Sequence, residues 1–77
     1  MDIYPNPAEN KVRIKLSQRH IQGTLTISSM DGHICYSNSV SNDTYIEVSV
    51  RGWAKGSYLV QLRCRNGQAT TEKMIVS

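Results

Sequence analysis

The sequence predicts an all-β fold, a small antiparallel, immunoglobulin-like β-sandwich of about seven short strands. Apolar and polar residues alternate with a period of two along much of the chain, and helical spacing does not persist over any long window. Val, Ile, Tyr, Ser and Thr, which favour strands, are frequent in these stretches. Turn-forming pairs separate them at the spacing of about 8–12 residues that is typical of a sandwich.

The first predicted strands flank a proline motif. Ile3 and Tyr4 form a short extended piece that ends at Pro5-Asn6-Pro7. Because proline lacks a backbone donor and fixes φ, this motif is predicted as an edge or entry segment. The next strand is predicted from Lys11 to Leu16, where the residues alternate cleanly. Its core-facing residues are Val12, Ile14 and Leu16.

A hairpin is predicted in the first half of the chain. Gln18 to Gly23 is predicted as a loop and Thr24 to Met30 as a strand, with Leu25 and Ile27 facing inward. The pair Asp31-Gly32 follows, and glycine accepts positive φ in such a turn without strain. The partner strand is predicted from His33 to Ser37, and a polar, turn-rich connection from Ser37 to Thr44.

The second half of the chain predicts three more strands. Tyr45 to Val50 alternates, and a connection from Arg51 to Gly56 carries Trp53, which is expected to fold over one end of the core. Tyr58 to Arg65 is predicted as the longest strand. The inward residues of these two strands are Ile46, Val48, Val50, Tyr58, Val60, Leu62 and Cys64.

The closing strand, Gln68 to Ser77, follows a second hairpin turn at Asn66-Gly67. A two-residue turn would place Lys73 on the core side, and a turn longer by one residue would place Glu72 there. We therefore expect a β-bulge between Thr71 and Lys73 that turns Met74 and Val76 inward.

Length and composition predict one domain over residues 1–77, without repeat or linker. The net charge of +3 comes from basic residues spread along the chain, which does not indicate nucleic acid. No apolar run is long enough for a membrane span. Cys35 and Cys64 match no metal spacing. They are interpreted as free residues buried in strands, or as a disulfide in an extracytoplasmic setting.

No catalytic chemistry is expected. The acidic residues each stand alone, His33 follows a turn without a nucleophile beside it, and Ser57 lacks the second glycine of a nucleophile elbow. We predict no enzyme activity, no cofactor and no metal site. The basic side chains have two interpretations: they keep the outer face solvated, or they form a docking face for an anionic partner. These residues are Lys11, Arg13, Lys15, Arg63 and Arg65.

Four segments in order resemble the C-terminal sorting domain of the type IX (Por) secretion system of Bacteroidetes. Ile3 to Pro7 is similar to the opening motif of that family, and Trp53 to Val60 resembles its Leu-x-x-Gly-x-Tyr-x-Val pattern. Glu72 to Ser77 looks like its terminal Lys-plus-aliphatic strand, and Gly32 stands at its hairpin. The matching residues are Pro5, Asn6, Pro7, Gly32, Gly56, Tyr58, Val60, Lys73, Met74, Ile75, Val76 and Ser77.

The chain departs from the family pattern at Trp53, where an aliphatic residue is usual, and in its two cysteines. The resemblance implies a non-catalytic tail that follows a cargo domain. It implies recognition by an outer-membrane translocon and removal by a sortase-like peptidase. The attached cargo would pass through the periplasm to the cell surface or the medium. Lys73 to Ser77 is expected to be the element recognised most directly, because it is terminal and edge-prone.

Two other functions are compatible with a sandwich of this size. A surface adhesion or carbohydrate-binding module would need an exposed aromatic platform, for which the candidates are Tyr4, Tyr36, Tyr45 and Trp53. An oligomerisation module would use unpaired strand edges.

Overall fold

The computed structural model describes residues 1–16, 22–41 and 45–77, and every regular element in this part of the chain is a β-strand. The strands are β1 (Asp2–Tyr4), β2 (Lys11–Lys15), β3 (Gln22–Ser29), β4 (Ile34–Ser41), β5 (Tyr45–Ser49), β6 (Gly56–Cys64) and β7 (Ala69–Val76).

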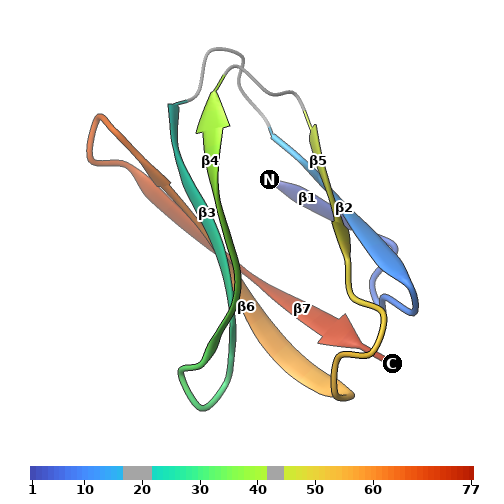
Figure 1. The fold of residues 1–77 in the computed structure, drawn as a ribbon. Coiled ribbons are helices and arrows are strands. Elements are labelled where there is room, and N and C mark those ends of the chain that lie inside the picture. The colour runs from blue at the N-terminus through green and yellow to red at the C-terminus, as the bar shows by residue number, and fades with distance from the viewer. Residues whose placement is uncertain (17–21, 42–44) are drawn as a thin grey trace.

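The strands form two antiparallel sheets that face each other (Figure 1). The small sheet has the order β1-β2-β5, and the large sheet has the order β4-β3-β6-β7. This confirms the predicted antiparallel sandwich. It also places β1 and β7, which carry the first and the last sequence motifs, at sheet edges. No helix of the described residues is long and apolar enough to cross a membrane.

The core lies between the sheets and consists mostly of side chains that the alternation predicted to face inward. Ala8 and Val40 are buried in addition, whereas Ile46 and Cys64, also predicted to face inward, are only partly buried. The same buried cluster contains Leu25 and Ile27 from β3 and, from β2 and its end, Val12, Ile14 and Leu16. Among the described residues no polar or charged side chain other than the tyrosine hydroxyl is counted in the buried set. The remaining buried residues are Ala8, Val40, Val48, Val50, Tyr58, Val60, Leu62, Met74 and Val76.

Two predicted connections are shorter than expected. Gln22 and Gly23, predicted as loop, begin β3, while the rest of that prediction lies at residues 18–21, outside the described part. Residues 37–41, predicted as a polar connection, belong to β4 because their backbones pair with β3. Val40 is buried opposite Gly23, although its neighbours are polar. Residues 42–44 lie outside the described part.

The expected β-bulge at Thr71 to Lys73 is wrong. The register of β6 and β7 is unbroken, with Tyr58 opposite Met74 and Val60 opposite Glu72. Glu72 therefore points to the core side but stays exposed, because β7 is an edge strand and its hairpin extends away from the small sheet (Figure 1). The irregular register lies instead in the β3–β4 pair, between Ile27 and Ser28.

The two cysteines are free. Cys64 is half-buried against the core, as predicted, but Cys35 lies at the irregularity of β4 and is exposed. Cys64 of β6 is opposite Gly23 of β3. Cys35 of β4 lies next to the residue that is opposite Ile27, which is four residues further along β3. Four residues of a strand span roughly 13 Å. A disulfide needs Cα atoms within about 7 Å, so this fold does not join the two cysteines.

Candidate functional site

The opening motif contacts the terminal strand. The side chain of Asn6 accepts a hydrogen bond from the Ile75 N–H at 3.0 Å and donates to the Lys73 carbonyl at 3.5 Å. The backbone of Ala8 continues this contact, since its N–H donates to the Ile75 carbonyl at 2.8 Å and its carbonyl accepts from the Ser77 N–H at 2.9 Å. Residues far apart in sequence thus share one edge of the large sheet.

The residue types of this segment suit the edge of a sheet. Asn6 carries both a donor and an acceptor, so one side chain satisfies a carbonyl and an N–H that face away from β6. Pro5 and Pro7 have no N–H and offer no donor to a further strand. The segment also links the two sheets, because β1 and β2 belong to the small sheet while Ala8 pairs with Val76 of the large one.

The glycine-tyrosine motif lies on the other side of β7. Gly56 is opposite Val76, and Tyr58 is opposite Met74. The Tyr58 ring is buried, its hydroxyl donates to the Ala54 carbonyl at 2.6 Å, and its centroid is 5.3 Å from that of Trp53. This contact confirms that Trp53 packs against the core. The proline motif, the glycine-tyrosine motif and the terminal strand therefore form one contiguous unit around β7.

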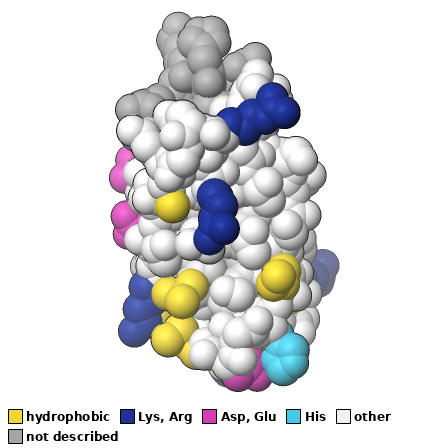
Figure 2. All heavy atoms as spheres, turned by 90° about the vertical axis from the view of Figure 1, so that its left-hand side faces the viewer, with side chains coloured by type: hydrophobic (Ala, Val, Ile, Leu, Met, Phe, Trp, Pro, Cys, Tyr) yellow, Lys and Arg dark blue, Asp and Glu magenta, His cyan; other side chains and the backbone are white. Residues whose placement is uncertain are grey.

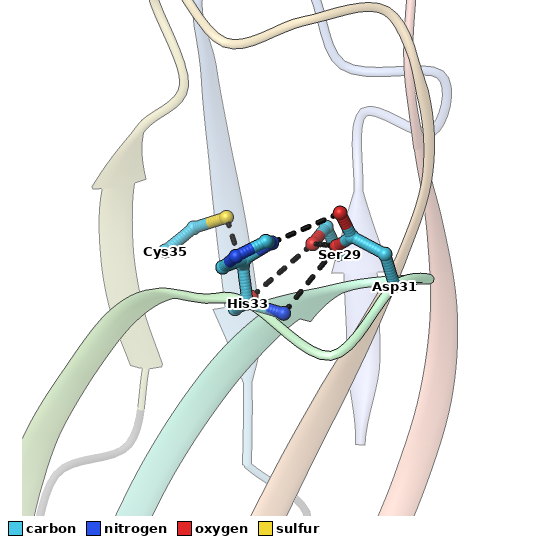
Figure 3. Close-up of polar contacts among 4 residues, drawn as sticks. All are labelled: Ser29, Asp31, His33 and Cys35. Carbon is cyan, nitrogen blue, oxygen red and sulfur yellow. Dashed lines mark hydrogen bonds and ion pairs between the residues drawn. The ribbon is translucent and has the colours of Figure 1, made fainter.

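The Asp31-Gly32 turn lies near the same end of the large sheet, since Ser29 is opposite Tyr58. Gly32 has φ of 95°, as a turn glycine requires. The Asp31 carboxylate accepts hydrogen bonds from the Ser29 hydroxyl and from the His33 N–H, and it lies 2.9 Å from His33 Nδ1 (Figure 3). The Ser29 hydroxyl contacts the carboxylate and not the imidazole, so the cluster stabilises the turn but lacks the serine–histidine hydrogen bond of a catalytic triad.

These contacts predict a pH dependence of the turn. The hydrogen bonds from Ser29 and His33 lower the pKa of Asp31 from 3.8 to about 2. Because the pKa is lowered on folding, the stabilisation by the carboxylate is present above pH 3.8 and is lost as the pH falls through about 2. A carboxyl ¹³C titration should give a midpoint near 2. In Ser29→Ala the midpoint should rise, and a wild-type midpoint at 3.8 would contradict the network.

The residues of the terminal strand divide by face. Met74 and Val76 are buried, so they fill the core. Lys73 and Ile75 point outward, and Ile75 is 42% exposed. Figure 2 looks onto the large sheet and shows separate apolar groups among basic and polar side chains. Of residues 73–76 at the end of β7, Lys73 and Ile75 are the two whose side chains are exposed to solvent.

Comparisons with known proteins agree with this arrangement. The family model for the secretion system C-terminal sorting domain matches residues 2–77. The chain belongs to this family. No curated protein matches the chain.

A solved structure has the same fold. It is a DUF3244 family protein with an immunoglobulin-like β-sandwich fold from Bacteroides vulgatus ATCC 8482. The match has a TM-score of 0.82 at 15% identity, and it covers 97% of this chain and 82% of that one. This likeness concerns the fold alone and confirms the predicted immunoglobulin-like arrangement of the sorting domain.

The five basic residues of the sorting domain do not form one surface. Lys11, Arg13 and Lys15 lie on the outer face of the small sheet, where the Glu47 carboxylate is 3.1 Å from Arg13 Nε and 3.8 Å from Lys11 Nζ. Lys15 is opposite Asp2. Carboxylates thus offset much of the positive charge of this face, which fits a solvated surface better than a docking face for an anion.

The other two arginines lie on the large sheet. Arg63 points outward from β6, and Arg65, in the following turn, donates to Gln22 Oε1 at 3.2 Å. They face away from the basic residues of β2, on the opposite side of the sandwich. A single partner surface cannot contact both groups without surrounding the domain.

The four aromatic residues considered for a carbohydrate-binding platform do not lie on one surface either. Tyr36 and Trp53 are half-buried and pack against the core. Tyr4 and Tyr45 are 45% and 57% exposed, but they lie on β1 and β5 with β2 between them. Tyr4 lines an open groove together with Pro5, Pro7, Glu9, Asn10, Lys11 and Arg13. Among the described residues no group of three or more His, Cys, Asp or Glu side chains is placed to hold a metal ion.

Proposed function

We propose that the chain is a non-catalytic sorting signal that directs a cargo protein, attached upstream, through the outer membrane to the cell surface or the medium. The observation that carries this proposal is the contact of Asn6 and Ala8 with β7, because it joins the first and last motifs of the family into one structural element. The membership in the sorting-domain family supports it.

The arrangement of the termini is compatible with this role. In Figure 1 the two ends of the chain lie apart, with the C-terminus beside the β1–β2 connection. An upstream cargo would leave the domain away from Ser77, so β7 would stay accessible to the outer-membrane translocon. Removal of the tail by a sortase-like peptidase would follow translocation, after transit through the periplasm.

The test is an export assay in a Bacteroidetes host that has the type IX system. A periplasm-targeted reporter carries residues 1–77 at its C-terminus, complete or without Lys73 to Ser77. We expect surface or medium delivery for the complete tail only. Since the truncation also removes core residues, a full-length Lys73→Ser/Ile75→Ser variant separates recognition from folding, and we expect it to reduce delivery while remaining folded.

The matched control is Lys15→Ser/Tyr45→Ser on the outer face of the small sheet, which should be delivered like the unmodified tail. A complete, folded fusion that stays in the periplasm would overturn the proposed function. A glycan array with the isolated domain would then test the carbohydrate-binding alternative, and solution mass at high concentration would test the oligomerisation alternative.

A further inference from the structure

The edge of β7 is only partly covered. In an antiparallel pair, the backbone N–H and C=O of one residue point to the same side, and this side alternates along the strand. The backbone of Ile75 bonds to Asn6 and Ala8, so it faces away from β6. The backbones of Ala69, Thr71 and Lys73 therefore face the same open side.

The Ala69–Lys73 half of this edge is unpaired except at the Lys73 carbonyl, which accepts a hydrogen bond from Asn6. Among residues 1–16, 22–41 and 45–77, no hydrogen bond reaches the N–H or the carbonyl of Ala69 or Thr71, or the N–H of Lys73. These three residues are exposed. A row of unpaired backbone groups on an edge strand is a template for one more strand.

We propose that this open half of the β7 edge binds an extended segment of the export machinery, added to the large sheet as a fifth strand. This inference rests on the proposed sorting function. It is supported by the contact that exists already: residues 6–8 run parallel to β7 and occupy the adjoining half of the same edge. An added strand would continue that contact along the edge.

Charge indicates the chemistry of the added strand. Glu72 points to the core side yet is exposed, and Lys73 points to the outer side. An inward charge at an edge disfavours pairing with an apolar strand. A strand with a basic residue opposite Glu72 would neutralise this charge, since opposite charges stabilise a cross-strand pair.

The same charge disfavours a second copy of this chain as the occupant. Antiparallel self-pairing centred on Glu72 would place the two Glu72 carboxylates directly opposite each other. A pairing centred on Thr71 would place them on a diagonal of one face, still within reach of each other. The geometry therefore favours a different polypeptide.

A proline at position 71 tests the inference. The N–H of Thr71 has no partner within the described chain, so Thr71→Pro removes no hydrogen bond of the fold, but it blocks an incoming strand. We expect delivery in the export assay to fall by about tenfold, as for the loss of about 1.4 kcal/mol. Thr71→Val is the matched control, because it retains the backbone donor and should be delivered normally. Circular dichroism checks that both variants fold.

A second variant and a direct measurement keep the test decisive if Thr71→Pro does not fold. Glu72→Lys, at an exposed position, should reduce delivery and leave thermal unfolding nearly unchanged. Outer-membrane vesicles from a host with the type IX system should slow hydrogen exchange at the Thr71 and Lys73 amides by about tenfold, whereas vesicles from a strain without it should not.

Normal delivery of folded Thr71→Pro, or of Glu72→Lys where the proline variant does not fold, would overturn the inference and leave the sorting function intact. Vesicle binding that leaves both amides unprotected would overturn it as well. Failure of the unmodified tail to deliver the reporter would instead count against the sorting function itself.

Discussion

Replacement of Met74 by alanine should lower the free energy of unfolding by about 2–5 kcal/mol, the range for truncating a large buried side chain. Met74 is fully buried, and it lies opposite Tyr58 in the layer between the sheets. A domain of this size has a total stability of only about 5–15 kcal/mol, so the loss is a large fraction of it. Urea unfolding followed by circular dichroism and Trp53 fluorescence measures the change.

Ile75→Ala is the matched control for this prediction. Ile75 is the next residue of the same strand and is 42% exposed, so its truncation should cost about 1 kcal/mol or less. In the export assay, delivery should be compared per folded molecule. On that scale Ile75→Ala should reduce delivery more than Met74→Ala, because the Ile75 side chain is exposed to a partner. Equal destabilisation by the two substitutions would contradict the assignment of Met74 to the core and Ile75 to the surface.

The parts of the fold that could be predicted from the sequence are those in which the local pattern of side chains indicates the backbone conformation. From Lys11 to Leu16, apolar and charged residues alternate, and the buried set follows this alternation. The turns at Gly32 and Gly67 were predicted because positive φ requires glycine there, and both have φ near 95°. Each of these signals is local.

The elements that sequence reasoning missed depend on distant backbone pairing. The second half of β4 is composed of Ser and Asn apart from Val40, so its side chains carry no strand signal, and pairing with β3 determines its conformation. The register of β7 was missed for a similar reason. The register places the charged residue Glu72 on the core side, but Glu72 stays exposed because β7 is a sheet edge, which is a property of the assembled sandwich.

In the candidate site, too, the local motifs could be predicted from the sequence, whereas the contact between them could not. The motifs around Asn6 and Ile75 were found as separate segments, but their contact joins residues 69 positions apart and has no local signal. One feature of the sequence is consistent with it. An asparagine between two prolines offers side-chain hydrogen bonds where the flanking backbone has no donors, which suits a segment that covers an edge.

Gly23→Ala should also be strongly destabilising, although the sequence predicted a loop at this position. Gly23 lies in β3 between Val40 of β4 and Cys64 of β6. A Cβ atom here would collide with the backbone carbonyl of Arg63 and would lie 2.9 Å from the Cα of Cys64. Because both obstacles are backbone atoms within a paired sheet, no side-chain rotation can relieve the collision.

The expected cost is about 1–3 kcal/mol or more, the range for overpacking a filled site. The lower entropy of the unfolded alanine chain returns only about 0.4–1 kcal/mol, so the sign does not change. The same urea titration measures it, with Thr24→Ala, at the next and exposed position, as the control of small effect. An alanine variant as stable as the unmodified domain would mean that β3 and β6 do not approach this closely at Gly23. Since β3 pairs with both β4 and β6, the central pairing of the large sheet would then need revision.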